Sequence, residues 1–172
     1  KRFDKIEYVA TLDELEDVRY IRGTIKQTTA YMTLRFDYNI TPDFTIQFYG
    51  MPFISAGRYS DFKYIDDADA NNFLDRFTAY SENQFVYNSS DEIYEVDENN
   101  DGTTDYTFDE PDFHIFDFNS NLVIRWEYRP GSILYIVWSQ KRNEFLSTGN
   151  FRMWDDTQTL FKDTYPHDIL LV

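Results

Sequence analysis

The chain lacks cysteine altogether and has only two histidines among its 172 residues. Without cysteine, neither a disulfide framework nor a thiolate metal site is possible. No stretch approaches the roughly 18 consecutive apolar residues of a membrane-spanning helix, and no glycine-rich phosphate-binding loop is present. The chain opens on Lys1 and has no apolar signal-like stretch, so we expect a processed or partial chain.

Positive charge is also scarce, since 16 basic residues stand against 31 acidic ones and the net charge is −15. This balance argues against nucleic acid as a partner, because the phosphate backbone attracts basic surfaces. The acidity is concentrated in residues 58–112, which hold 16 acidic and three basic residues, a net charge of −13. We therefore predict one long acidic loop over this segment.

Catalytic patterns are missing as well. His114 and His167 are far apart in the sequence, and neither has a serine or cysteine in a recognisable nucleophile context. Paired carboxylates of the kind that glycosidases use are expected by number alone in so acidic a chain. We predict that the chain is not an enzyme.

What the chain does have is an alternation of apolar and polar residues in two segments, 30–40 and 121–129, in which Val123 is the one apolar residue on the polar face. A period of two predicts a β-strand with one apolar and one polar face. Aromatic residues make up 19% of the chain, which also favours strands over helices.

The first pair of strands is joined by a short turn. The strand expected over residues 20–40 is long for a soluble sheet, in which strands usually have ~3–10 residues. It ends at Thr41-Pro42-Asp43, where proline presets the turn, and the next strand starts at Phe44 and frays between Gly50 and Gly57. These segments predict an antiparallel hairpin.

A second hairpin repeats this design. A strand over 113–129 turns at Pro130-Gly131 into a strand over 132–145, and residues 168–172 resemble the start of another. Two weaker predictions are a short helix within 155–164 and a helical turn within 11–17.

The connections alternate in length, with short turns at 41–43 and 130–131 and long segments at 58–112 and 146–166. Outer-membrane barrels show this asymmetry between tight periplasmic turns and long extracellular loops. The sequence thus favours an all-β fold of about five antiparallel up-and-down strands, part of a larger transmembrane β-barrel with long acidic extracellular loops. A soluble antiparallel sheet also alternates in this way and is the alternative fold.

In such a barrel, the two faces of each strand meet different surroundings. The predicted lipid-facing residues are Met32, Leu34, Phe36, Leu122, Ile124, Trp126, Leu134, Ile136 and Trp138. The predicted lumen-facing polar residues are Arg35, Asp37, Arg125, Glu127 and Arg129. Mixed charges in the lumen favour ion-pair ladders that fill the interior, with a selectivity lining as the alternative.

Residues 97–105, which read DENNDGTTD, carry the pattern of a calcium loop. Oxygen-bearing side chains stand at positions 1, 3, 5 and 9 and glycine at position 6, as in an EF-hand. The predicted Ca²⁺ ligands are Asp97, Asn99, Asp101, the carbonyl of Thr103, and Asp105. Position 12, which is a bidentate glutamate in that motif, is Phe108 here. The alternative is a solvated acidic turn.

Three strings of the sequence resemble a known family: LRFDYNITPDFTIQFYGMPFISAGRYSDF (34–62), VDENNDGTTDYTF (96–108) and NLVIRWEYRPGSILYIVWSQ (121–140). They are similar to the C-terminal barrel region, a domain of unknown function, of Bacteroidetes-type outer-membrane proteins that carry an N-terminal family-nine-like carbohydrate-binding domain. The resemblance implies that residues 1–172 are the C-terminal part of an outer-membrane β-barrel, with the N-terminal part absent. Sugar binding is therefore assigned to no residue of this chain.

The functional expectation is an outer-membrane barrel segment that acts as a pore, scaffold or anchor, linked to surface carbohydrate handling or transport. The expected partners are outer-membrane lipid, the remainder of the barrel or another chain that completes it, and other outer-membrane or surface proteins. Five strands cannot close a membrane barrel, because the smallest bacterial barrels have eight. The alternative function is a soluble, calcium-stabilised β-domain that binds glycans.

Overall fold

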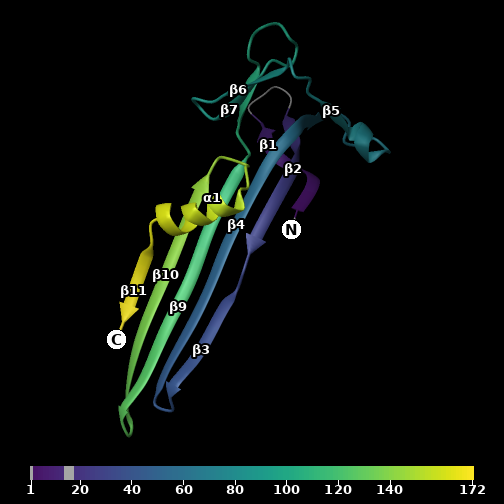
Figure 1. Cartoon of the computed structure of the whole chain (residues 1–172). Helices are drawn as coiled ribbons and strands as arrows, with labels where there is room; N and C mark the ends of the chain where they lie inside the picture. The colour runs from purple at the N-terminus through teal and green to yellow at the C-terminus, as the bar shows by residue number, and fades with distance from the viewer. Residues whose placement is uncertain (1, 14–17) are drawn as a thin grey trace.

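The computed structural model describes residues 2–13 and 18–172 and is dominated by one long antiparallel sheet (Figure 1). Its strands pair in the order in which they follow along the chain. They are β1 (Arg2–Leu12), β2 (Arg19–Tyr31), β4 (Phe44–Ile65), β9 (Phe113–Arg129), β10 (Ser132–Leu146) and β11 (His167–Leu171). The expected all-β, antiparallel, up-and-down arrangement is confirmed, with β1 as a strand that the sequence did not indicate.

The strand predicted over 20–40 is interrupted. β3 (Leu34–Thr41) continues in line after β2 and pairs with the first part of β4. The break lies opposite Pro52 of β4, which has no N–H to donate to a neighbouring strand. Only its carbonyl is used there, and it accepts the N–H of Met32 at 3.1 Å.

The expected fraying of β4 between Gly50 and Gly57 is wrong, because this strand continues to Ile65. Both glycines lie under aromatic rings. A Cβ on Gly57 would come within 2.4 Å of the Phe113 ring, and one on Gly50 within 3.0 Å of the Phe48 ring. Glycine therefore serves here to let rings cross the strand.

The acidic segment accordingly begins after residue 65 rather than at 58, and it is folded. It contains η1 (Phe73–Arg76), β5 (Phe77–Ala79), β6 (Phe85–Asn88), β7 (Ile93–Val96) and β8 (Tyr106–Asp109). β5 pairs with the end of β4, and β6, β7 and β8 form a separate three-stranded sheet. We call this end of the molecule, at the top of Figure 1, the loop end, and the opposite end, with the two tight turns, the turn end.

An aromatic core joins the small sheet to the long one at the loop end. The Phe62 ring of β4 lies 5.0 Å from the Tyr94 ring and 5.3 Å from the Phe108 ring. Ile21 and Val96, which belong to the same cluster, are both fully buried. The acidic segment is thus anchored to the long sheet by a separate aromatic core at the loop end.

The second long connection folds back onto the sheet. Its helix α1 (Met153–Gln158) continues into η2 (Thr159–Asp163) and lies across β9 and β10 in Figure 1, so the helix expected within 155–164 is confirmed. Leu160 of η2 is fully buried against Ile54, Phe116 and Phe118. None of the helices in the described part of the chain is long and apolar enough to cross a membrane.

The helical turn expected within 11–17 is wrong at its start, since Thr11 and Leu12 belong to β1, and residues 14–17 lie outside the described residues. Across residues 2–13 and 18–172, the outer edges of β1 and β11 pair with no other strand. The sheet is therefore open on both sides.

The first prediction concerns the packing of η2. Leu160→Ala should destabilise the helix by about 2–5 kcal/mol, because it leaves a cavity against Phe116 and Phe118. Hydrogen exchange of the amides of 153–163 measures this loss. Trp154→Ala is the matched control, since that side chain is 81% exposed and its removal should change stability by about 0.5 kcal/mol or less. Equal losses in the two variants would contradict the packing.

Candidate functional site

The turn end of the sheet has two faces of opposite character, and the register between strands creates them. β4 and β9 pair without a shift from Phe44 opposite Trp126 to Gly57 opposite Phe113. β10 follows β9 with the same parity, with Ile136 opposite Ile124. Even-numbered residues thus share one face, which we call the apolar face. At the turn end it carries Leu34, Phe36, Tyr38, Ile40, Phe44, Ile46, Phe48, Leu122, Ile124, Trp126, Leu134, Ile136, Trp138 and Leu170.

This apolar face is uncovered at the turn end. Phe36 is 54% exposed and Trp126 is 47% exposed. No residue within 31–49 or 121–146 is buried. Of the residues predicted to face lipid, all lie on this face except Met32, which lies in the break between β2 and β3 and is itself exposed. On β10 the face turns polar beyond Trp138, whose indole N–H donates to the Asp168 carboxylate at 3.0 Å.

The opposite, polar face carries the predicted lumen set. Arg125 Nη2 donates to Glu127 Oε2 at 3.2 Å, and the other carboxylate oxygen of Glu127 accepts the N–H of Gly131 at 2.9 Å. Arg35 and Asp37 form an exposed ion pair at 3.6 Å on β3. Arg129 is the last residue of β9 and is exposed. The set is thus distributed along one face without forming a single cluster.

Hydrogen bonds between neighbouring strands continue this polar face toward the loop end. Ser139 Oγ donates to Asn121 Oδ1 at 2.6 Å, between β10 and β9. Gln27 Nε2 donates to Ser55 Oγ at 3.0 Å, and the hydroxyl of Thr29 lies 2.8 Å from the same oxygen. Polar side chains of this face therefore form hydrogen bonds with one another between neighbouring strands.

A buried pair ties helix α1 to the sheet where the apolar face is covered. His114 Nε2 of β9 lies 3.2 Å from Asp156 Oδ2, and both residues are buried. The same carboxylate oxygen accepts the backbone N–H of Arg152 at 2.7 Å, and the His114 ring stacks on Phe116. Burial lowers the pKa of His114 below its usual 6.5, although the Asp156 charge acts in the opposite direction.

The predicted calcium loop is the connection between β7 and β8. The Asp97 carboxylate accepts the N–H groups of Asp101 and Gly102 at 3.1 and 2.7 Å. Asn99 Oδ1 accepts the N–H of Asp101 at 2.8 Å, so Asp97 and Asn99 share one donor. Gly102 takes a positive φ of 90°, as the sharp turn requires.

Two further contacts close this loop. Hydrogen bonds from the hydroxyl and the N–H of Thr103 hold the pKa of Asp101 below its usual range. Asp105 Oδ2 accepts the N–H of Glu98 at 2.8 Å, which closes the loop at its base. Over the described residues, no group of three or more His, Cys, Asp or Glu is arranged to hold a metal ion.

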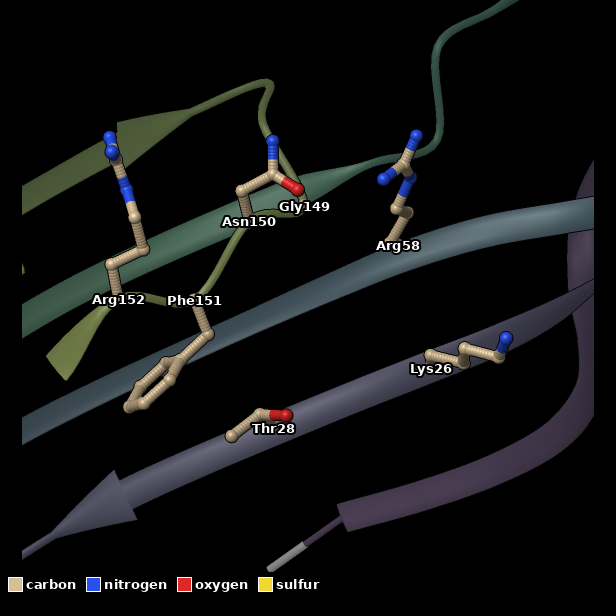
Figure 2. A pocket seen from close by; sticks show the side chains of 7 residues that line it. All are labelled: Lys26, Thr28, Arg58, Gly149, Asn150, Phe151 and Arg152. Carbon is tan, nitrogen blue, oxygen red and sulfur yellow. The ribbon is translucent and has the colours of Figure 1, made fainter.

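A basic pocket that the sequence did not indicate lies on the even-numbered face, closer to the loop end. It has a volume of about 510 Å³ and is formed by β2, β4 and the connection that leads into α1 (Figure 2). The lining residues are Lys26, Thr28, Arg58, Gly149, Asn150, Phe151 and Arg152. Lys26, Arg58 and Arg152 are far apart in the sequence, so no local sequence pattern predicts this pocket.

An apolar groove of about 380 Å³ lies on the same face, beside helix α1. Its walls come from the end of β2, the start of β3, the middle of β4 and the helix itself. The lining residues are Ala30, Tyr31, Met32, Leu34, Pro52, Ile54, Met153, Thr157, Leu160 and Phe161. Apart from Thr157, these side chains are apolar or aromatic, so the groove suits a hydrocarbon occupant.

Comparison of the chain with protein-family models, with curated proteins and with solved structures found no match. The function must therefore be argued from the two faces, the loop and the pockets described above.

The second prediction follows from the buried pair. A lowered histidine pKa means that the folded state holds neutral His114, so stability is lost as the pH falls below about 6.5. Hydrogen exchange, corrected for its intrinsic pH dependence, should show weaker protection of residues 153–163 at pH 5 than at pH 7.5. His114→Gln keeps a donor for Asp156 but does not titrate in this range, so its protection should change less. An equal pH response in both proteins would refute this role.

Proposed function

We propose that the chain is a segment of a transmembrane β-barrel in the bacterial outer membrane, with the apolar face against lipid and the polar face toward the barrel interior. The observation that carries the proposal is the absence of any buried residue within 31–49 or 121–146. An uncovered apolar sheet face of this size is rare in soluble monomers and marks a surface that binds a partner or a membrane. Lipid covers such a face continuously.

The length of the apolar face supports this proposal. On β4 its even-numbered positions extend from Phe44 to Ile54, and on β9 from Phe116 to Trp126, eleven residues in each case, of which Ile54, Phe116 and Phe118 lie under η2. A transmembrane β-strand needs ~9–11 residues when it is tilted. On β10 the apolar residues end at Trp138, so the apolar stretch is shorter there than on β4 and β9. We attribute this difference to the tilt of the strands, because a tilted strand crosses the membrane boundary at a different residue from its neighbour.

Aromatic residues near the tight turns add further support. Tyr38, Phe44, Trp126 and Tyr128 gather at the turn end of β3, β4 and β9, and the Phe44 and Trp126 rings are in edge-to-face contact. Aromatic girdles of barrel proteins occupy this position at the membrane interface. The turn end then lies at the periplasmic side, and the acidic insertion at the extracellular side.

The open edges of β3 and β11 at the turn end show what the segment needs, because within residues 2–13 and 18–172 β3 pairs only with β4. Unpaired backbone groups cannot face hydrocarbon, so further strands, from the rest of the protein or from another chain, must close the barrel. The completed barrel would act as a pore, scaffold or anchor for surface components, and we assign it no catalytic role. The resemblance to carbohydrate-associated barrels stays a prediction and adds the expectation of surface carbohydrate handling or transport.

The third prediction compares two neighbouring positions of β9. Ile124→Arg places a charge on the apolar face, where it costs ~2–4 kcal/mol in mid-membrane and should block insertion. Val123→Arg places the same charge on the polar face and should be tolerated. Protease protection after reconstitution of the completed barrel into phosphatidylcholine vesicles measures insertion, because further strands must first close the open edges of this segment.

Two outcomes of that experiment would contradict the membrane proposal. One is equal insertion of the two variants. The other is a wild-type chain that stays monomeric in buffer without detergent, which would favour the soluble glycan-binding domain.

We further propose that Ca²⁺ binds the loop between β7 and β8. Its support is the convergence of Asp97 and Asn99 on one backbone N–H, which gathers side-chain oxygens of the kind that Ca²⁺ prefers. The carbonyl of Thr103 and the carboxylates of Asp101 and Asp105 would complete a set of five ligands, and water would supply the rest. An affinity of the extracellular type, about 10⁻⁴–10⁻³ M, is expected.

The fourth prediction tests this loop by calorimetry. The wild-type chain should take up Ca²⁺, and Asp101→Ala should abolish the uptake because it removes one of the predicted ligands. Glu82→Ala is the control, an exposed carboxylate elsewhere in the acidic segment. Failure of the wild-type chain to bind, or identical binding by Asp101→Ala, would refute the calcium site.

A further inference from the structure

We propose that the basic pocket and the apolar groove together bind one phosphate-bearing lipid, with its headgroup in the pocket and an acyl chain in the groove. This inference rests on the proposed membrane location and names a ligand for that surface. Both cavities lie on the even-numbered face of the sheet and share its β2 and β4 strands.

The linings of the two cavities follow one another along the chain. Thr28 lines the pocket and Ala30 lines the groove, and these are successive even-numbered positions on β2. The same change occurs on the other wall, where Arg152 lines the pocket and the next residue, Met153, lines the groove. Phe151 packs against the core cluster under helix α1 and so marks the border between them. A polar site next to an apolar one suits an amphiphile.

The charge of the pocket selects an anionic headgroup. Lys26, Arg58 and Arg152 line it, and no carboxylate does, in a chain whose net charge is −15. Figure 2 shows the three cationic side chains on three different segments, which are β2, β4 and the connection into α1; they extend in different directions. Flexible cations of this kind bind lipid phosphate groups at membrane interfaces.

Two carboxylates act on the cations of the pocket, since Asp112 interacts electrostatically with Arg58 and Asp155 pairs with Arg152. The Asp112 carboxylate accepts the N–H of Tyr59 at 2.6 Å and also that of Gly149, which fixes the connection above β4. A Cβ on Gly149 would lie 2.6 Å from Arg58 Cβ, so the chain passes directly over this strand. Asp155 pairs with Arg152 at 3.2 Å, but both side chains are largely exposed. An anionic ligand can displace so exposed a pair at small cost.

The depth of the pocket also fits a headgroup. Arg58 lies four residues beyond Ile54 on β4, which is roughly 13 Å along the strand and about 10 Å in depth when the strand is tilted by 35–45°. The headgroup region adds about 5–8 Å to each side of the hydrocarbon core, and long basic side chains extend toward it. The groove lies at the level of Ile54, at the edge of the proposed hydrocarbon region.

The fifth prediction concerns lipid binding in neutral detergent micelles, measured by native mass spectrometry. The wild-type chain should retain phosphatidylglycerol in preference to phosphatidylcholine. The triple variant Lys26→Gln, Arg58→Gln and Arg152→Gln should lose about fivefold in affinity for each cation removed. Lys141→Gln is the control, because this exposed cation lies on the opposite face.

A second variant tests the groove. Ala30→Phe adds a ring to the groove wall, so it should weaken the binding of phosphatidylglycerol with long acyl chains more than that of its six-carbon analogue. Three results would overturn the lipid site: unchanged binding by the triple variant, equal binding of phosphatidylcholine, or inorganic phosphate that binds alone and displaces the lipid at similar concentration. The last result would identify a free-phosphate site.

The same proteins separate this proposal from the membrane proposal. Insertion into pure phosphatidylcholine vesicles needs no anionic lipid, so the triple variant should insert as the wild-type chain does. A completed wild-type barrel that fails to insert, built from a chain that still binds phosphatidylglycerol selectively, would refute the barrel segment and leave the lipid site standing. Normal insertion with no selectivity for phosphatidylglycerol would refute the lipid site and leave the barrel segment standing.

Discussion

The unshifted pairing of β4 with β9 is the constraint on which the rest of the molecule depends. It maintains one register from Phe44 opposite Trp126 to Gly57 opposite Phe113. In contrast, the pairings of β1 with β2, β2 with β4, β3 with β4 and β9 with β10 each contain a register shift. A slip of one residue would move every apolar side chain of one strand to the polar face. The separation of the two faces therefore rests on this central pair.

The sequence predicts the parts of this fold that local signals determine. The turns at Pro42 and Pro130 and the bounds of β9 follow from proline, glycine and alternation, which act within a few residues. The course of β4 does not follow, because Gly50 and Gly57 have the pattern of strand breakers. Only the rings of Phe48 and Phe113, the latter from a distant strand, explain why these glycines continue it.

The candidate sites divide in the same way. The loop proposed to bind Ca²⁺ is contiguous in the sequence, so a local motif predicts it. The basic pocket is not contiguous, since Lys26, Arg58 and Arg152 are separated by 32 and 94 positions and meet only when the connection into α1 crosses the sheet. The packing of η2 over Phe116 and Phe118 likewise depends on tertiary structure, so it cannot be predicted from local sequence. Nothing in the alternation of β9 distinguishes these covered positions from the uncovered Ile124.

The distribution of buried residues gives the molecule two regions with different requirements. At the loop end, Phe62 and Leu160 belong to cores that the chain completes with its own side chains. At the turn end, the hydrogen-bonded strands are equally regular, yet both faces remain open. Hydrogen bonds alone contribute little net stability in water, where the separated strands would bond to solvent instead. A single-layer sheet with one apolar face therefore needs an external cover. In the proposed membrane location, lipid would meet this requirement without a second protein layer, and it would also make the backbone pairing of β4 with β9 obligatory.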